Sequence, residues 1–199
     1  MGDQWLTRQT LVQRAQDPND HQAWDEFVRY YHSFITVVLR KMQFYTGEMD
    51  DIVQEILIIL WKALPSFEID RDRCQFRTWM SVLIRNKAID CFKSSKRYEN
   101  HLKKAAEQME ALSEEQQSEI DQMIEQEWER HITHCALDNI RSIFSGSAIK
   151  VFELSLEGLS ATEIASQTGV QEKSVKVLKS RVKKRVIKEI QYLRSELEM

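Results

Sequence analysis

The stretch FRTWMSVLIRNKAIDCFKSSKR, residues 76–97, combines two patterns. Its apolar residues recur at steps of three and four, which predicts a helix with one buried face. Basic residues stand among and after them, and Asp90 is the only acid. Packing against a core explains the apolar residues and leaves the bases unexplained. The apolar positions are Phe76, Trp79, Met80, Leu83, Ile84, Ala88, Ile89 and Phe92.

The composition of the chain favours helices. Its 199 residues include only five Gly and two Pro, and no alternating segments bounded by Asn-Gly or Asp-Gly turns occur. Three widely spaced Cys argue against a disulfide framework. The amino terminus has no apolar signal core, and the longest strongly apolar run, residues 56–61, is far shorter than the roughly 20 residues of a membrane span. We expect an all-α, cytoplasmic protein without a membrane segment or a cofactor.

Charge is segregated along the chain, although the net charge is only −3. Residues 85–104 carry seven Lys or Arg and two acids, a net of +5. Residues 105–130 carry nine acids and one Arg, a net of −8, and residues 171–188 carry eight Lys or Arg and one Glu, a net of +7. Two basic blocks flanking an acidic one indicate separate surfaces with separate partners.

Two small helical domains joined by an acidic linker are expected. The first covers residues 1–98 and includes a helix over about 50–64 that Pro65 ends. Residues 99–127 are rich in Gln and Glu and lack a convincing apolar face, so they are interpreted as a linker with some helix. Helical spacing resumes at Trp128, where the second domain, 128–199, begins.

The second domain contains a helix-turn-helix pattern. Ser160 and Glu163 have capping-box spacing, Ala165 is small enough for close helix approach, and Gly169 suits a tight turn. The alternative is an ordinary helical hairpin with a solvated basic face. Residues 173–188 contain eight cations and no acid, which favours DNA binding.

The opening stretch has a corresponding interpretation. Aromatic rings stack on unpaired bases and nearby cations hold the phosphates, so the combination suits single-stranded or melted DNA. The alternative, favoured for each residue taken singly, is that Phe76 and Trp79 are core residues, and the sequence leaves both interpretations open.

These segments resemble a known family. DDIVQEILIILWKAL, residues 50–64, followed by the opening stretch, resembles region two of bacterial RNA polymerase sigma factors, and the second domain resembles their region four. Over residues 20–97 and 130–190, the chain is similar to the extracytoplasmic-function (ECF) group. The resemblance implies a subunit that binds core RNA polymerase and directs promoter recognition, DNA melting and transcription initiation.

The resemblance also implies roles for individual residues. The expected partners are promoter DNA and core polymerase, which would be contacted through its beta-prime clamp helices and its beta flap. Members of the ECF group are often bound by anti-sigma factors, and the sequence identifies no such partner. The expected core polymerase contacts are Asp51, Gln54, Glu55, Leu60 and Trp61. Gln54 and Glu55 come first among them, and the alternative for the inward apolar members is a purely structural role. The expected minus-ten contacts are Arg77, Trp79, Asn86, Lys87, Asp90, Lys93 and Arg97, with Asn86 and Asp90 on the family's RNxAxD pattern. The expected minus-thirty-five contacts are Gln171, Lys173, Ser174, Lys176, Val177, Ser180, Arg181 and Lys184.

The recognition helix and the acidic linker each need a separate comment. Family members often carry Ser-Arg where this chain has Val177-Leu178, so base readout is expected to differ there. The acidic linker would thread through the polymerase towards the RNA exit path, or would stay solvated. Because its acids oppose the basic blocks, we expect weak promoter binding by the protein without polymerase.

Two other classes of function would account for parts of the sequence. A conventional helix-turn-helix regulator would explain residues 160–188 and leave the opening stretch unused. An enzyme or metal site would need more than the HxxHC cluster of His131, His134 and Cys135, which lacks a second ligand pair. No Gly-rich phosphate loop or nucleophile elbow occurs in the sequence. We therefore expect neither catalysis nor a metal.

Overall fold

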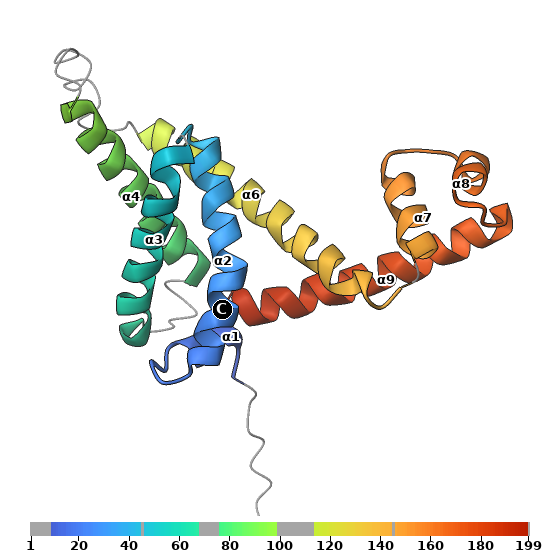
Figure 1. The fold of residues 1–199 in the computed structure, drawn as a ribbon, viewed down its shortest axis with the longest axis horizontal. Coiled ribbons are helices and arrows are strands. Elements are labelled where there is room, and N and C mark those ends of the chain that lie inside the picture. Colours follow the sequence, from blue (N-terminus) through green and yellow to red (C-terminus); the bar gives the residue numbers. More distant parts are fainter. Residues whose placement is uncertain (1–8, 45, 68–75, 99–113, 145, 199) are drawn as a thin grey trace, which may run out of the picture. The chain divides into compact units, whose positions relative to one another are not determined.

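A computed structural model describes residues 9–44, 46–67, 76–98, 114–144 and 146–198, without the side chains of 46–48, 92–98 and 114. Within these ranges the chain is helical and contains no strand, which confirms the all-α prediction (Figure 1). The elements are α1 (Leu11–Ala15), α2 (His21–Lys41), α3 (Thr46–Ala63), the 3-10 turn η1 (Leu64–Ser66), α4 (Phe76–Tyr98), α6 (Glu114–Arg141), α7 (Gly146–Leu156), α8 (Ala161–Thr168) and α9 (Glu172–Leu197).

The chain forms two compact units. Unit 1 consists of Met1–Glu129 with Glu196–Met199, and unit 2 consists of Arg130–Ser195. The boundary falls inside α6 and not at residue 98 or 128. Residues 114–127, assigned from the sequence to the linker, form the first half of that helix, and residues 99–113 lie outside the described residues.

Side-chain caps set the start of the first two helices. Thr10 and Gln13 form a capping box at α1, with a Gln13 N–H to Thr10 Oγ1 distance of 3.3 Å. Asp20 Oδ1 accepts a 2.8 Å hydrogen bond from the Ala23 N–H at α2. That bond lowers the pKa of Asp20 from its ordinary 3.8. Residues 17–20 therefore lie between α1 and α2.

The core of unit 1 is largely aromatic. Phe27, Tyr31 and Phe34 from α2 are buried, and so is Phe76 of α4. Trp128 of α6 is also buried, with its ring stacked on Tyr31 at 5.7 Å between centroids and edge-on to Phe34 at 4.9 Å. Trp128 thus belongs to the core of unit 1 and not to the start of the second domain. Ile124, one turn earlier, is buried as well, so the acidic part of α6 does have an apolar edge.

Two apolar clusters hold unit 2 together. The first joins α6, α7 and α9 and contains Ile140, Ala148, Ile149, Phe152, Val182 and Val186. The second joins α7, α8 and the start of α9 and contains Val151, Leu154, Ile164 and Val175. Together they fix α8 and the first turns of α9 as a pair.

Candidate nucleic-acid interface

The turn between α8 and α9 has the geometry that the sequence predicted. Glu163 accepts hydrogen bonds from the Ser160 hydroxyl at 2.6 Å and the Ser160 N–H at 2.8 Å. These bonds lower the pKa of Glu163 from its ordinary 4.5, chiefly through the hydroxyl. At the other end of α8, Gly169 has a φ of 69°, and its N–H donates to the Ala165 carbonyl. The left-handed glycine ends α8 and allows α9 to begin at Glu172.

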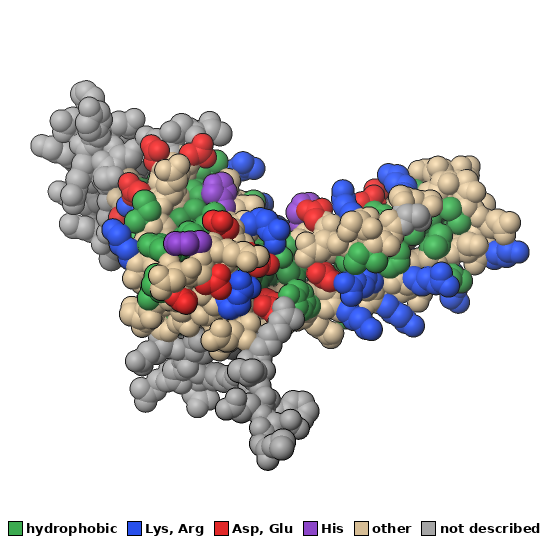
Figure 2. Space-filling model, turned by 60° about the horizontal axis from the view of Figure 1, so that its bottom comes forward, with side chains coloured by type: hydrophobic (Ala, Val, Ile, Leu, Met, Phe, Trp, Pro, Cys, Tyr) green, Lys and Arg blue, Asp and Glu red, His purple; other side chains and the backbone are tan. Residues whose placement is uncertain are grey.

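The outer face of α9 carries the residues predicted for the minus-thirty-five contact. All of them are exposed except Ser174, which is half-buried and whose N–H donates to the Gln171 carbonyl at 2.8 Å. Figure 2 shows Lys and Arg side chains gathered along one edge of unit 2. Within the described parts of the chain, no carboxylate forms an ion pair with the exposed cations Lys173, Lys176, Lys179, Arg181, Lys183, Lys184 and Lys188.

Arg185 differs from its neighbours on α9. It donates at 3.0 Å to Glu189, a buried carboxylate that also accepts a 3.1 Å hydrogen bond from Asn139 of α6. Pairing is required for a carboxylate so enclosed. Arg185 therefore helps to hold α9 against α6 within unit 2.

The outward face of α3 contains part of the predicted polymerase set. Asp51, Gln54 and Glu55 are exposed at helical spacing. Trp61 is half-buried and meets Trp24 edge-on at 4.7 Å. Leu60 is completely buried and belongs to the core, which favours the structural alternative for this residue.

Sequence reasoning missed an apolar pair on this face. Ile58 is 51% exposed and Ile59 37% exposed, one turn after Gln54 and Glu55. Spacing of four residues from those two polar positions would have placed both isoleucines on the outward face. The expected set of polar contacts therefore continues into an apolar patch.

On α4 the structure separates core residues from surface residues. Phe76, Met80, Ile84 and Ala88 are buried at four-residue steps, so Phe76 is a core residue. Trp79 is half-buried and lies 4.8 Å from the ring of Phe67. Asn86 and Asp90 are exposed on the opposite side, together with Thr78 and Val82. The side chains of Lys93 and Arg97 lie outside the described residues.

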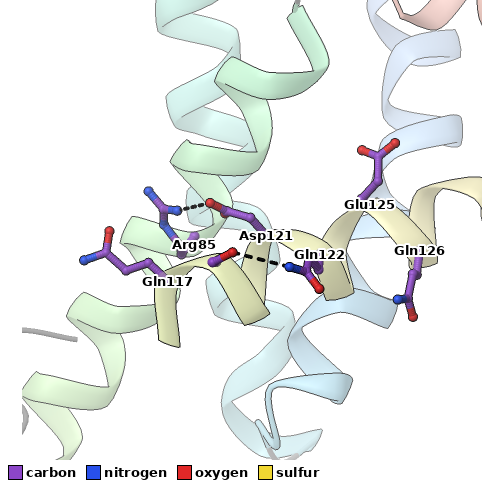
Figure 3. Close-up of a pocket in the computed structure, with 7 residues that line it drawn as sticks. Arg85, Gln117, Asp121, Gln122, Glu125 and Gln126 are labelled. Carbon is purple, nitrogen blue, oxygen red and sulfur yellow. Dashed lines mark hydrogen bonds and ion pairs between the residues drawn. The ribbon is translucent and has the colours of Figure 1, made fainter. Parts of the chain in front are cut away.

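Each cation of α4 whose side chain is described forms an ion pair with another helix. Arg77 lies 2.5 Å from Glu125 and 4.0 Å from Glu129, both on α6. Arg85 pairs with Asp121 of α6, in a shallow groove shown in Figure 3. Lys87 pairs with Glu55 of α3, and this hydrogen bond raises the pKa of Lys87 from its ordinary 10.5. The cations of α4 whose side chains are described are thus neutralised, in contrast to the exposed cations of α9.

The histidine and cysteine cluster forms two separate contacts. Cys135 Sγ lies 3.5 Å from His131 Nε2, and His134 Nε2 lies 3.2 Å from Asp138 Oδ2. Within the described ranges, no three His, Cys, Asp or Glu side chains are grouped closely enough to hold a metal ion. Among the same residues, no helix has both the length and the apolarity to cross a bilayer.

Comparison with known proteins places both halves of the chain in one family. The Sigma-70 region 2 family matches residues 27–98, and the Sigma-70 region 4 family matches residues 150–186. Curated relatives include the ECF RNA polymerase sigma-E factors of Escherichia coli strain K12, Shigella flexneri and Salmonella typhimurium strain LT2. Each is 37% identical over 84 residues, which is 42% of this chain.

The structural comparison is weaker. The solved structure of CnrH in complex with the cytosolic domain of CnrY aligns over 91% of this chain and 95% of that chain. The sequence identity is 20% and the TM-score is 0.36.

The matched segment spans about two fifths, 41%, of the length of the curated relatives. Region 2 and region 4 nevertheless occur here in the family's order, on the two units that the fold separates. The chain belongs to the ECF group of bacterial RNA polymerase sigma factors.

Proposed function

We propose that this protein binds core RNA polymerase and directs it to promoters, where it supports DNA melting and transcription initiation. The observation that carries the proposal is the outer face of α9, where seven exposed cations without an ion pair to a described carboxylate follow a well-formed helix-turn-helix. An array of this kind is a phosphate-binding surface, because it lacks the acids that surface helices ordinarily interleave with bases.

Unit 2 supplies the proposed contact with the minus-thirty-five element. The first turns of α9 enter the major groove, so Gln171, Lys173, Ser174 and Lys176 lie nearest to the base edges. Arg181 and Lys184 lie further along and bind the phosphates. Val177 is 49% exposed and offers an apolar contact, such as one with a thymine methyl group.

Unit 1 supplies the proposed polymerase contact through α3. Gln54 and Glu55 provide hydrogen bonds and charge, and Ile58 and Ile59 provide the apolar area that a stable interface requires at its centre. The beta-prime clamp helices are the proposed partner of this face. The beta flap is the proposed partner of unit 2.

The minus-ten element is proposed to bind along α4. Asn86 and Asp90 are exposed and can bond to base edges, while the half-buried ring of Trp79 can stack with an unpaired base. Stacking of this kind contributes roughly 1–3 kcal/mol per base, comparable with the cost of unstacking it from the duplex. The protein would hold the opened strand without catalysing a reaction, and the polymerase would synthesise the RNA. We propose the cytoplasm as its location.

Footprinting separates this function from that of a conventional regulator. On DNA to which the protein has been bound together with core polymerase, we expect protection of two separated elements and permanganate-reactive thymines near the downstream one. A regulator would protect duplex DNA alone and would leave the thymines unreactive. If the protein alone protects the DNA, and if adding core polymerase leaves the footprint unchanged, the proposal is refuted.

A further inference from the structure

Ion pairs join the acidic half of α6 to two cations of α4. Asp121 and Glu125 are four residues apart on α6, and they pair with Arg85 and Arg77, which are eight residues apart on α4. Glu129, one turn further along α6, approaches Arg77 at 4.0 Å. Three carboxylates of α6 therefore approach two guanidinium groups of α4.

We propose that residues 121–129 of α6 act as an internal anionic competitor that occupies the DNA-binding cations of α4 until a DNA strand displaces it. This inference rests on the proposed function, which places the minus-ten strand along α4. Arg77 is among the residues expected to contact that strand, and Arg85 of the same helix is added to them here. It adds a regulatory contact in which the occupant of the cations is a named segment of the same chain.

The chemistry of the two ligands supports an exchange. Guanidinium groups bind carboxylates and phosphates in the same planar geometry, so a phosphate can take the place of a carboxylate oxygen. The Arg77 and Arg85 side chains are only 20% and 13% exposed. A strand can reach them fully only when the carboxylates move away.

The acidic partners are placed so that they can move. Glu125 is about half exposed, as is Asp121, and Arg85 and Asp121 meet in a groove open to solvent. Figure 3 shows that amide side chains, Gln117 and Gln122 among them, surround this pair. Without an apolar cover, the ion pairs remain accessible to competing ions.

A second set of contacts keeps the acidic segment near α4 after it is displaced. Trp128 and Ile124 are buried in unit 1, and Glu127 pairs with Lys41 of α2 at 3.6 Å. The segment is therefore tethered, and its carboxylates compete at a high effective concentration. Tethering makes weak individual ion pairs effective against DNA in the protein without polymerase.

The test measures binding of a fluorescein-labelled deoxythymidine oligonucleotide by anisotropy, without polymerase and at physiological ionic strength. The full chain carrying Asp121→Asn and Glu125→Gln is compared with a matched control carrying Glu115→Gln and Glu119→Gln. The control has the same change in charge on the same helix, and neither residue forms an ion pair with a side chain that the structure describes. We expect the first variant to bind about three- to tenfold more tightly than the control. Equal affinities would overturn the proposal.

A second measurement uses the wild-type chain, because the substitutions could raise DNA affinity by destabilising α6 and not by removing competing carboxylates. Saturating oligonucleotide should increase amide hydrogen exchange within residues 115–126 and leave the region around Trp128 protected. Unchanged exchange in residues 115–126 would overturn the proposal. Neither assay contains polymerase, so the two proposals can fail separately. Equal DNA affinities of the variant and its control, together with normal promoter-directed transcription by the wild type with polymerase, would refute only this inference. Absence of that transcription would refute the proposed function.

Discussion

The Lys87 ammonium forms an ion pair with the Glu55 carboxylate, joining α4 to the outward face of α3. Glu55 lies on the surface proposed for core polymerase, and Lys87 lies on the surface proposed for the minus-ten strand. A polymerase group that binds Glu55 would release Lys87 for a phosphate. One ion pair thus couples two proposed binding events.

A double-mutant cycle with Glu55→Gln and Lys87→Gln tests this pair. Glu55 is 55% exposed and solvent screens the interaction, so we expect a coupling of about 0.2–1 kcal/mol in the free energy of unfolding. Because pairing raises the pKa of Lys87, the coupling is present below pH 10.5 and is lost as the pH rises through the shifted value. All five Trp precede residue 130, so fluorescence follows unit 1. Additive effects would show that the pair contributes nothing.

Neighbouring residues of α3 are expected to respond differently to substitution. Leu60→Ala should destabilise unit 1 by about 2–5 kcal/mol, because it leaves a cavity in the core. Ile58→Ser removes an exposed side chain and should change stability by less than about 0.5 kcal/mol. Cosedimentation with core polymerase should nevertheless weaken in the Ile58 variant. Normal polymerase binding by that variant would exclude the apolar patch from the interface.

The turn of the helix-turn-helix depends on Gly169. Gly169→Ala would hold an L-residue at a φ of 69° and should destabilise unit 2 by about 1 kcal/mol. No heavy atom outside its immediate chain lies within 4 Å of the added Cβ, so the loss would be backbone strain and not a clash. Gly146→Ala is the matched control, because its position is equally open and its φ is not positive. Thermal unfolding followed by circular dichroism measures both, and equal melting temperatures would contradict the strain argument.

The capping box at α8 predicts a dependence on pH. The pKa of Glu163 is lower in the folded state than its ordinary 4.5, so the stabilisation is complete above pH 4.5 and falls as the pH drops through the folded value. Wild type should therefore melt above Glu163→Gln at neutral pH, and the difference should shrink in acid. A difference that stays constant with pH would mean that the ionised carboxylate is not the stabilising form.

The sequence predicted local features well where one helix contains all the information. The capping box at Ser160 and the glycine turn at Gly169 depend on residues within a few positions of each other, and both were confirmed. The buried stripe on α4 was predicted from its period, although Trp79, Leu83 and Ile89 proved to be only half-buried. The side chain of Phe92 lies outside the described residues.

Features that depend on distant residues could not be predicted. On α3, apolar residues occur on nearly every side of the helix, so its pattern could not show that Leu60 is buried while Ile58 is exposed. Trp128 follows an acidic segment, and only the rings of Tyr31 and Phe34 place it in unit 1. Likewise, nothing in a charge count indicates which acid pairs with Arg77.

Sequencing the RNA made by core polymerase on a genomic template, with and without this protein, tests the central claim most directly. We predict that the protein adds a set of transcripts with discrete 5′ ends, preceded by two shared sequence elements. Combined Lys176→Gln and Arg181→Gln should reduce these transcripts, because both exposed cations lie on the proposed duplex-binding face of α9. The same transcript ends with and without the protein would contradict the account.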